Sequence, residues 1–156
     1  MASLTIVKRI AARPSIVFDS ITTAEGIAGW WGPDSGPVLA AQSDARVGGA
    51  YLVRFRAEDG RVHEARGEYL EMVRPERVVM SFHWAFGGEP QEAGNVSRVT
   101  MELRAINDGT ELTFTHADLA DELSKASHGQ GWGGALEKLE RRLQNADPLR
   151  TGPSPS

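Results

Sequence analysis

The sequence predicts an α+β fold of the helix-grip type, in which a curved antiparallel sheet of about six to seven strands wraps around a long carboxy-terminal helix. Three observations predict it. Apolar and polar residues alternate in several segments separated by turn residues, two short helical segments follow the first strand, and the apolar period lengthens to that of a helix in the last third. A sheet with one apolar face needs a cover, and only the last helix is long enough to provide it.

The first elements are a strand and two short helices. Residues 4–10 alternate weakly and are rich in Thr, Ile and Val, which is typical of a strand. Pro14 suits the first residue of a helix, and Thr23 can cap a second helix over residues 24–29. Residues 34–44 are rich in Gly, Pro and Ser, which indicates a connection with one irregular strand.

The middle of the chain has the pattern of a meander. Strands are predicted over residues 51–56, 62–73, 77–84, 98–104 and 112–116. Hairpin turns are predicted at residues 58–60 and 107–109, because Asn and Gly tolerate positive φ. Glu64, Glu68 and Glu71 alternate with arginines and indicate a solvated strand face, and the polar loop over residues 87–95 is expected to be mobile.

The last third predicts one long amphipathic helix. Trp132, Leu136, Leu139 and Leu143 form a single apolar stripe at helical spacing. The glycine-rich stretch over residues 129–134 is placed at the start of this helix, where it lets the helix pack closely on the sheet or accommodate a ligand. The chain is therefore expected to form a single domain over residues 1–146. Residues 147–156, with three of the eight prolines, are expected to form a disordered tail.

Composition removes several classes of function. The 156 residues include no cysteine, which excludes disulfides, thiolate metal sites and a cysteine nucleophile. The net charge of −4 argues against a nucleic-acid partner. No apolar run is long enough to span a membrane and the start lacks a signal-peptide pattern, so a cytoplasmic location is predicted. The four histidines lack metal-ligand spacing, and neither a metal nor a cofactor is expected.

Five motifs occur in the order of one known family. They are Trp30-Trp31-Gly32-Pro33, residues 46–51, residues 67–77, residues 109–116, and His128 followed by Gly131-Trp132 with Leu136 and Leu139. Together they resemble the activator of heat shock protein 90 ATPase homologue family, within the START-like (SRPBCC) superfamily, from about Thr5 to Leu143. The resemblance implies a helix-grip fold around a cavity. It also implies a link to chaperones and the stress response, in a superfamily whose members bind lipids, sterols or polyketides and include a few cyclases and hydrolases.

The candidate ligand-binding residues are ring side chains on the predicted inner face or at the ends of elements. They are Trp30, Trp31, Tyr51, His63, Tyr69, Trp84, His116 and Trp132. Aromatic rings around a concave, mostly apolar interior are typical of a small-molecule pocket. The alternative for each ring is a role in core packing, which we favour for Trp132 because it lies on the apolar stripe. For His116 we favour a buried histidine that is hydrogen-bonded to a neighbour.

Three functions are compatible with this pattern. The leading hypothesis is a binding module, with no chemistry assumed, that holds a hydrophobic or amphipathic small molecule between the sheet and the long helix. The second is a protein-interaction role such as a co-chaperone, with a homodimer through the sheet edge as a related case. The third is a small hydrolase or cyclase that uses His116 or His63 beside Tyr51 or Tyr69. No catalytic residue is assigned from the sequence.

Overall fold

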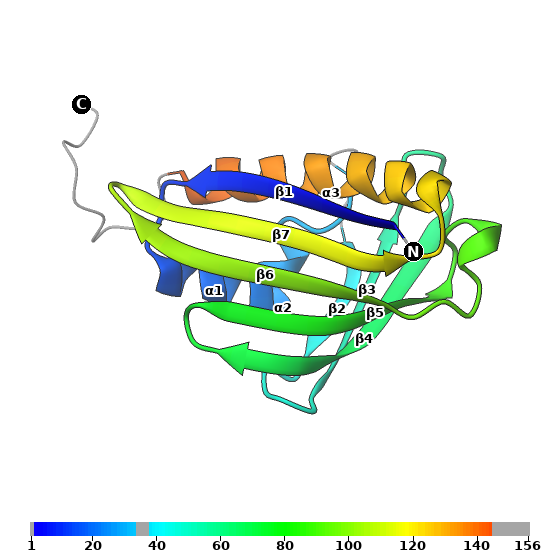
Figure 1. The fold of residues 1–156 in the computed structure, drawn as a ribbon, viewed down its shortest axis with the longest axis horizontal. Helices are drawn as coiled ribbons and strands as arrows, with labels where there is room; N and C mark the ends of the chain where they lie inside the picture. The colour runs from blue at the N-terminus through cyan, green and yellow to red at the C-terminus, as the bar shows by residue number, and fades with distance from the viewer. Residues whose placement is uncertain (1, 34–37, 145–156) are drawn as a thin grey trace.

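The computed structural model describes residues 2–33 and 38–144, and it contains one seven-stranded antiparallel sheet and a long last helix (Figure 1). The elements in chain order are β1 (Ala2–Ile10), α1 (Pro14–Thr22), α2 (Ala24–Ala28), β2 (Val38–Ser43), β3 (Ala50–Arg56), β4 (Val62–Val73), β5 (Arg77–Phe86), the short 3-10 helix η1 (Pro90–Glu92), β6 (Ser97–Ile106), β7 (Gly109–Leu119) and α3 (Glu122–Leu143). The predicted helix-grip fold is confirmed. Within the described residues, no helix is both long and apolar enough to cross a membrane.

The sheet is a meander that the first strand completes. Its order is β1-β7-β6-β5-β4-β3-β2, so that β2 to β7 follow one another and β1 adds to β7 at the far edge. Figure 1 shows α3 running beside β1 and β7, while α1 and α2 connect β1 to the opposite edge strand, β2. The core therefore lies between the concave face of the sheet and these three helices.

Local signals in the sequence position the two short helices as predicted. Pro14 is the first residue of α1, where its missing N–H removes no helical hydrogen bond. The Thr23 hydroxyl accepts a hydrogen bond from the Gly26 N–H at 3.0 Å and so caps α2. Of the predicted connection over residues 34–44, residues 34–37 lie outside the described residues, and residues 38–43 form the strand β2. The predicted tail over residues 147–156 also lies outside the described residues.

The solvated strand face predicted around Glu64 is wrong for that residue. Glu64 is fully buried, and it lies opposite Arg54 on the neighbouring strand. Arg54 Nη2 lies 2.7 Å from Glu64 Oε1, and Arg66 Nε lies 2.6 Å from Glu64 Oε2. The two guanidinium groups cover the carboxylate, so it is paired by charge-assisted hydrogen bonds and not by water.

The predicted start of the last helix is also wrong. Helix α3 begins at Glu122, where the Asp121 carboxylate accepts a hydrogen bond from the Ser124 N–H at 2.8 Å. The glycines at residues 129–134 consequently lie in the middle of the helix. A Cβ atom at Gly131, Gly133 or Gly134 would meet no atom within 4 Å, so close packing on the sheet does not explain these glycines.

The polar loop after β5 is partly internal. It contains η1, and the Glu92 side chain at the end of η1 is only 5% exposed. The loop therefore brings a carboxylate into the interior, which its polar composition did not indicate.

Gly67 lies where β4 passes close to β5, and alanine there should destabilise the fold. An added Cβ would collide with the backbone carbonyl of Ser81 and would approach Tyr51 Cε1 to 2.6 Å. We expect Gly67→Ala to lower the free energy of unfolding by about 3 kcal/mol, because neither neighbour can move freely. Urea unfolding measures this change.

Gly133→Ala is the matched control for that experiment. Its Cβ would enter open space on α3, and alanine is a better helix former by about 1 kcal/mol. An equal loss of stability in both variants would contradict the packing described for Gly67.

Candidate functional site

A pocket of about 390 Å³ opens between α3 and the neighbouring end of the sheet. Four segments line it: residues 31–33 after α2, residues 55–63 around the β3–β4 hairpin, residues 82–92 from β5 to η1, and residues 127–135 of α3. This volume falls within the usual range of small-molecule pockets, roughly 300–1,000 Å³.

Aromatic rings form much of the pocket wall. Trp31 and Trp132 meet edge to face with their ring centroids 4.8 Å apart. Phe82 and Trp84 meet in the same way at 5.1 Å, and Phe55 lies 6.0 Å from Trp84. These contacts fix the rings against one another, so the aromatic part of the wall is preformed.

A chain of hydrogen bonds connects α3 to three strands beneath the pocket. The Trp132 indole N–H donates to His116 Nδ1 at 3.0 Å, and His116 Nε2 lies 2.7 Å from Ser97 Oγ. Ser97 Oγ in turn donates to the Phe82 carbonyl at 3.2 Å. Because His116 Nδ1 accepts, its proton is assigned to Nε2, which donates to Ser97. Every polar side-chain atom in this series of hydrogen bonds therefore has a hydrogen-bond partner.

These contacts hold His116 in its neutral form. The residue is fully buried, and burial together with the neighbouring His128 lowers the pKa of His116 from 6.5 to about 2. Both ring nitrogens are engaged with protein groups. His116 therefore has no free nitrogen with which to act as an acid or a base on a bound molecule.

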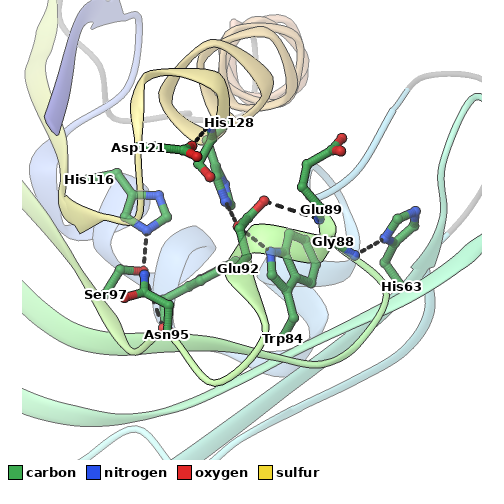
Figure 2. A network of polar contacts seen from close by, with 12 residues as sticks. His63, Trp84, Gly88, Glu89, Glu92, Asn95, Ser97, His116, Asp121 and His128 are labelled. Atoms are coloured by element: carbon green, nitrogen blue, oxygen red, sulfur yellow. Dashed lines mark hydrogen bonds and ion pairs between the residues drawn. The ribbon is translucent and has the colours of Figure 1, made fainter. Parts of the chain in front are cut away.

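A second buried cluster is centred on Glu92 and lies at the pocket wall. Figure 2 shows the Glu92 carboxylate between His128 and Trp84; its Oε2 lies 2.6 Å from His128 Nε2 and 2.7 Å from the Trp84 indole nitrogen. The Glu89 N–H donates to the other carboxylate oxygen at 3.2 Å. Burial alone would raise the pKa of Glu92, but the contacts with His128 and Trp84 outweigh it and lower the pKa.

His63 lies at the opposite side of the pocket with one nitrogen unsatisfied. Its Nδ1 accepts the Gly88 N–H at 2.8 Å, as Figure 2 shows, which assigns the proton of the neutral ring to Nε2. This Nε2 is buried and makes no hydrogen bond with any described residue, and Asp59 Oδ1 is 4.0 Å away. Burial, and next the nearby Arg61, lower the pKa of His63.

The structure divides the predicted binding residues into two groups. Trp31, His63, Trp84 and Trp132 line the pocket. The remaining four are buried away from its lining, and their polar atoms bond to the protein: Trp30 to the Ser20 carbonyl, Tyr51 to the Ser81 carbonyl, Tyr69 to Ser43 Oγ, and His116 as described above. A ligand-binding role stays a prediction for the first group, and the second group packs the core.

Sequence reasoning missed two important members of the pocket wall. Glu92 was hidden in a polar loop, and the predicted site omitted His128. The two side chains meet across 36 positions of sequence, which no local pattern reveals. The available signal was weak: Pro90 follows Glu89, and Glu92 is three residues after Glu89, which is the spacing of a helix capping box. Among residues 2–33 and 38–144, no three His, Asp or Glu side chains gather to hold a metal ion.

Known proteins share both the sequence pattern and the fold. The family model described as Activator of Hsp90 ATPase homolog 1-like protein matches residues 11–144. A crystal structure of a protein from Chromobacterium violaceum is 25% identical, with a TM-score of 0.80 over 91% of this chain and 96% of that chain. The AHSA1 protein from Silicibacter pomeroyi is 23% identical, with a TM-score of 0.77 over 91% and 97%.

A third similar structure extends the comparison. A protein from Mycobacterium smegmatis is 19% identical, with a TM-score of 0.78 over 92% of this chain and 91% of that chain. No curated protein matches the chain closely enough to count as a relative. The similarity to the last two structures concerns the fold alone.

The lowered pKa of His116 predicts a pH-dependent stability. Below pH 6.5 His116 binds a proton in the unfolded chain but stays neutral in the folded chain. The contribution of His116 to folding stability is therefore fully present above pH 6.5 and is lost as the pH falls toward about 2. Between about pH 6 and pH 4.5 this histidine should contribute a slope of up to about 1.4 kcal/mol per pH unit.

Urea unfolding of the wild type and of His116→Gln at several pH values measures this contribution. Glutamine does not titrate, so the variant should be less stable at pH 7 but should lose less stability on acidification. The lowered pKa of His63 leaves a residual slope of the same sign. Equal slopes for the two proteins would show that His116 is not held neutral.

Proposed function

The chain belongs to the Activator of Hsp90 ATPase homolog 1-like family, and from this premise we propose that it is a binding module for a hydrophobic or amphipathic small molecule, such as a lipid or an aromatic polyketide. The ligand would lie between the sheet and α3. The observation that carries this proposal is the preformed pocket of about 390 Å³ with its wall of aromatic rings. A largely apolar pocket with a few oriented polar groups is the usual form of a small-molecule site.

Glycines on α3 support this proposal because they leave the pocket empty of protein atoms. Gly131 and Gly134 line the pocket and are three residues apart, so they share one face of the helix. An added Cβ at either position would meet no atom within 4 Å. A glycine inside a helix costs about 1 kcal/mol relative to alanine, and an open cavity gives a reason to accept that cost.

The hydrogen bonding of His116 and of Glu92 favours binding without chemistry at these two residues. His116 is buried, is neutral and has both nitrogens engaged. The Glu92 carboxylate already receives hydrogen bonds from Trp84 and from the Glu89 N–H, beside its contact with His128. These groups are committed to holding the pocket wall in place, which suits a binding role.

Filling the pocket tests this function directly. Leucine in place of Gly131 or Gly134 should occupy the cavity and weaken the binding of Nile red, a neutral apolar dye, by at least about tenfold, which corresponds to 1.4 kcal/mol. Dye fluorescence measures the affinity, and circular dichroism confirms that each variant is folded.

Gly133→Leu is the control for those variants. Gly133 also has open space around its Cβ position, but it does not line the pocket. Its dye affinity should equal that of the wild type. If the wild type binds no dye, or if all three leucine variants bind as well as it does, the pocket is not the binding site.

A chaperone interaction is a second proposal, favoured by the description of the family. Eight large apolar side chains are 44–62% exposed and could contribute to a protein interface: Val7, Leu39, Val47, Leu70, Val73, Phe86, Val96 and Leu123. The protein should then raise the ATPase rate of a bacterial chaperone of the heat shock protein 90 class. A flat response would remove this proposal, and light scattering tests the related proposal of a homodimer.

A further inference from the structure

We propose that the pocket selects a cationic amphiphile: a molecule with an apolar body, a positively charged nitrogen and an oxygen acceptor near that nitrogen. This inference rests on the proposed binding function and names the class of ligand. Three features of the pocket carry it: an excess of carboxylates, a wall of aromatic rings, and a buried N–H donor that has no partner.

The charged side chains that line the pocket are mostly acidic. Four of them are carboxylates and one is a guanidinium: Glu58, Asp59, Glu89, Glu92 and Arg61. Arg61 Nη1 lies 4.0 Å from Asp59 Oδ2, and Glu92 contacts His128.

Glu58 and Glu89 have no ion-pair partner among the described residues. A cleft with low-dielectric walls and charge of one sign attracts ligands of the opposite sign. The electrostatics of the pocket therefore favour a cation and oppose an anion.

The aromatic wall of the pocket also favours a positively charged ligand. Trp31, Trp84 and Trp132 line the pocket together with Phe55 and Phe82. A cation over the face of an aromatic ring is attracted by the ring quadrupole, most strongly for tryptophan, and quaternary ammonium groups are recognised in this way. Aromatic rings and carboxylates thus act together on a charged nitrogen, while the rings alone accommodate the apolar body.

His63 adds a requirement for an oxygen acceptor. The residue is only 8% exposed, and it lines the pocket. Its Nδ1 accepts the Gly88 N–H, so Nε2 carries the proton, and this buried donor makes no hydrogen bond with the described residues. A buried polar group without a partner is costly, and a ligand oxygen at Nε2 would remove that cost. Asp59 Oδ1 lies 4.0 Å from His63 Nε2. A positively charged nitrogen next to the ligand oxygen would therefore be attracted by the Asp59 carboxylate.

Four probes with a common ten-carbon chain test the proposal on the full-length protein. They are decanoylcholine, decyltrimethylammonium, decanol and decanoate, each used below its micelle-forming concentration. Quenching of tryptophan fluorescence reports binding because three of the four tryptophans line the pocket. We expect both cations to bind about tenfold more tightly than decanol, with decanoylcholine the tighter of the two and decanoate the weakest.

Variants assign the preference to individual residues. Glu58→Gln and Glu89→Gln should each weaken the binding of the two cations about two- to fivefold and leave the affinity for decanol unchanged, because only the negative charge of the side chain is removed. Glu76→Gln is the matched control for Glu58→Gln, since Glu76 is likewise an exposed glutamate in a hairpin turn but lies outside the pocket lining. His63→Phe should abolish the advantage of decanoylcholine over decyltrimethylammonium.

The outcomes separate the class of ligand from the binding function itself. If no probe binds, the proposed binding function fails, and this inference fails with it. If decanol or decanoate binds at least as tightly as the cations, or if the two glutamine variants match the Glu76→Gln control, the pocket binds ligands but the cationic class is wrong. If His63→Phe keeps the preference for decanoylcholine, the role of Nε2 is wrong.

Discussion

The hydrogen bonds that join α3 to the sheet determine the shape of the interior. Trp132 on the helix contacts His116 on β7, and His128 on the helix contacts Glu92 at the end of η1; each contact involves a buried polar atom. Buried polar groups are stabilising only when they are fully paired, and a half-paired network is worse than an apolar one. This requirement fixes the position of the helix along the sheet. It also explains why His116 stays neutral while His128 lies beside it with ring centroids 4.7 Å apart.

The same fixed helix separates the interior into a closed part and an open part. On the closed side, Trp30, Tyr51 and Tyr69 have their polar atoms bonded to the protein. On the open side, the glycines of α3 leave space, the aromatic rings form a wall, and the Nε2 atom of His63 has no partner among the described residues. The paired polar groups on the closed side leave no site for a ligand there, whereas the unpaired donor on the open side can orient a bound molecule. The function proposed for this member of the family follows from that contrast.

Much of the fold could be predicted from the sequence because its signals are local. Alternation gave the strands, Pro14 and Thr23 gave the short helices, and the predicted hairpin at residues 107–109 is present, with Asp108 at φ 67°. Residues 122–128 of α3 were missed because the glycines that follow them resemble a break before the apolar stripe, although Asp121 supplied a capping signal. Half of the predicted binding residues line the pocket. Glu92 and the burial of Glu64 could not be predicted, since each depends on partners that only the tertiary fold brings close.

Nitrogen-15 NMR of the tryptophan and histidine side chains tests the division of the interior most directly. The measurement follows the indole N–H and imidazole signals while decyltrimethylammonium is added to the full-length protein. The structure predicts that the signals of Trp31, Trp84 and His63 shift with ligand, whereas those of Trp30 and His116 stay in place and His116 keeps its proton on Nε2. Shifts concentrated at Trp30 and His116, or no shift at any of these residues, would contradict the account.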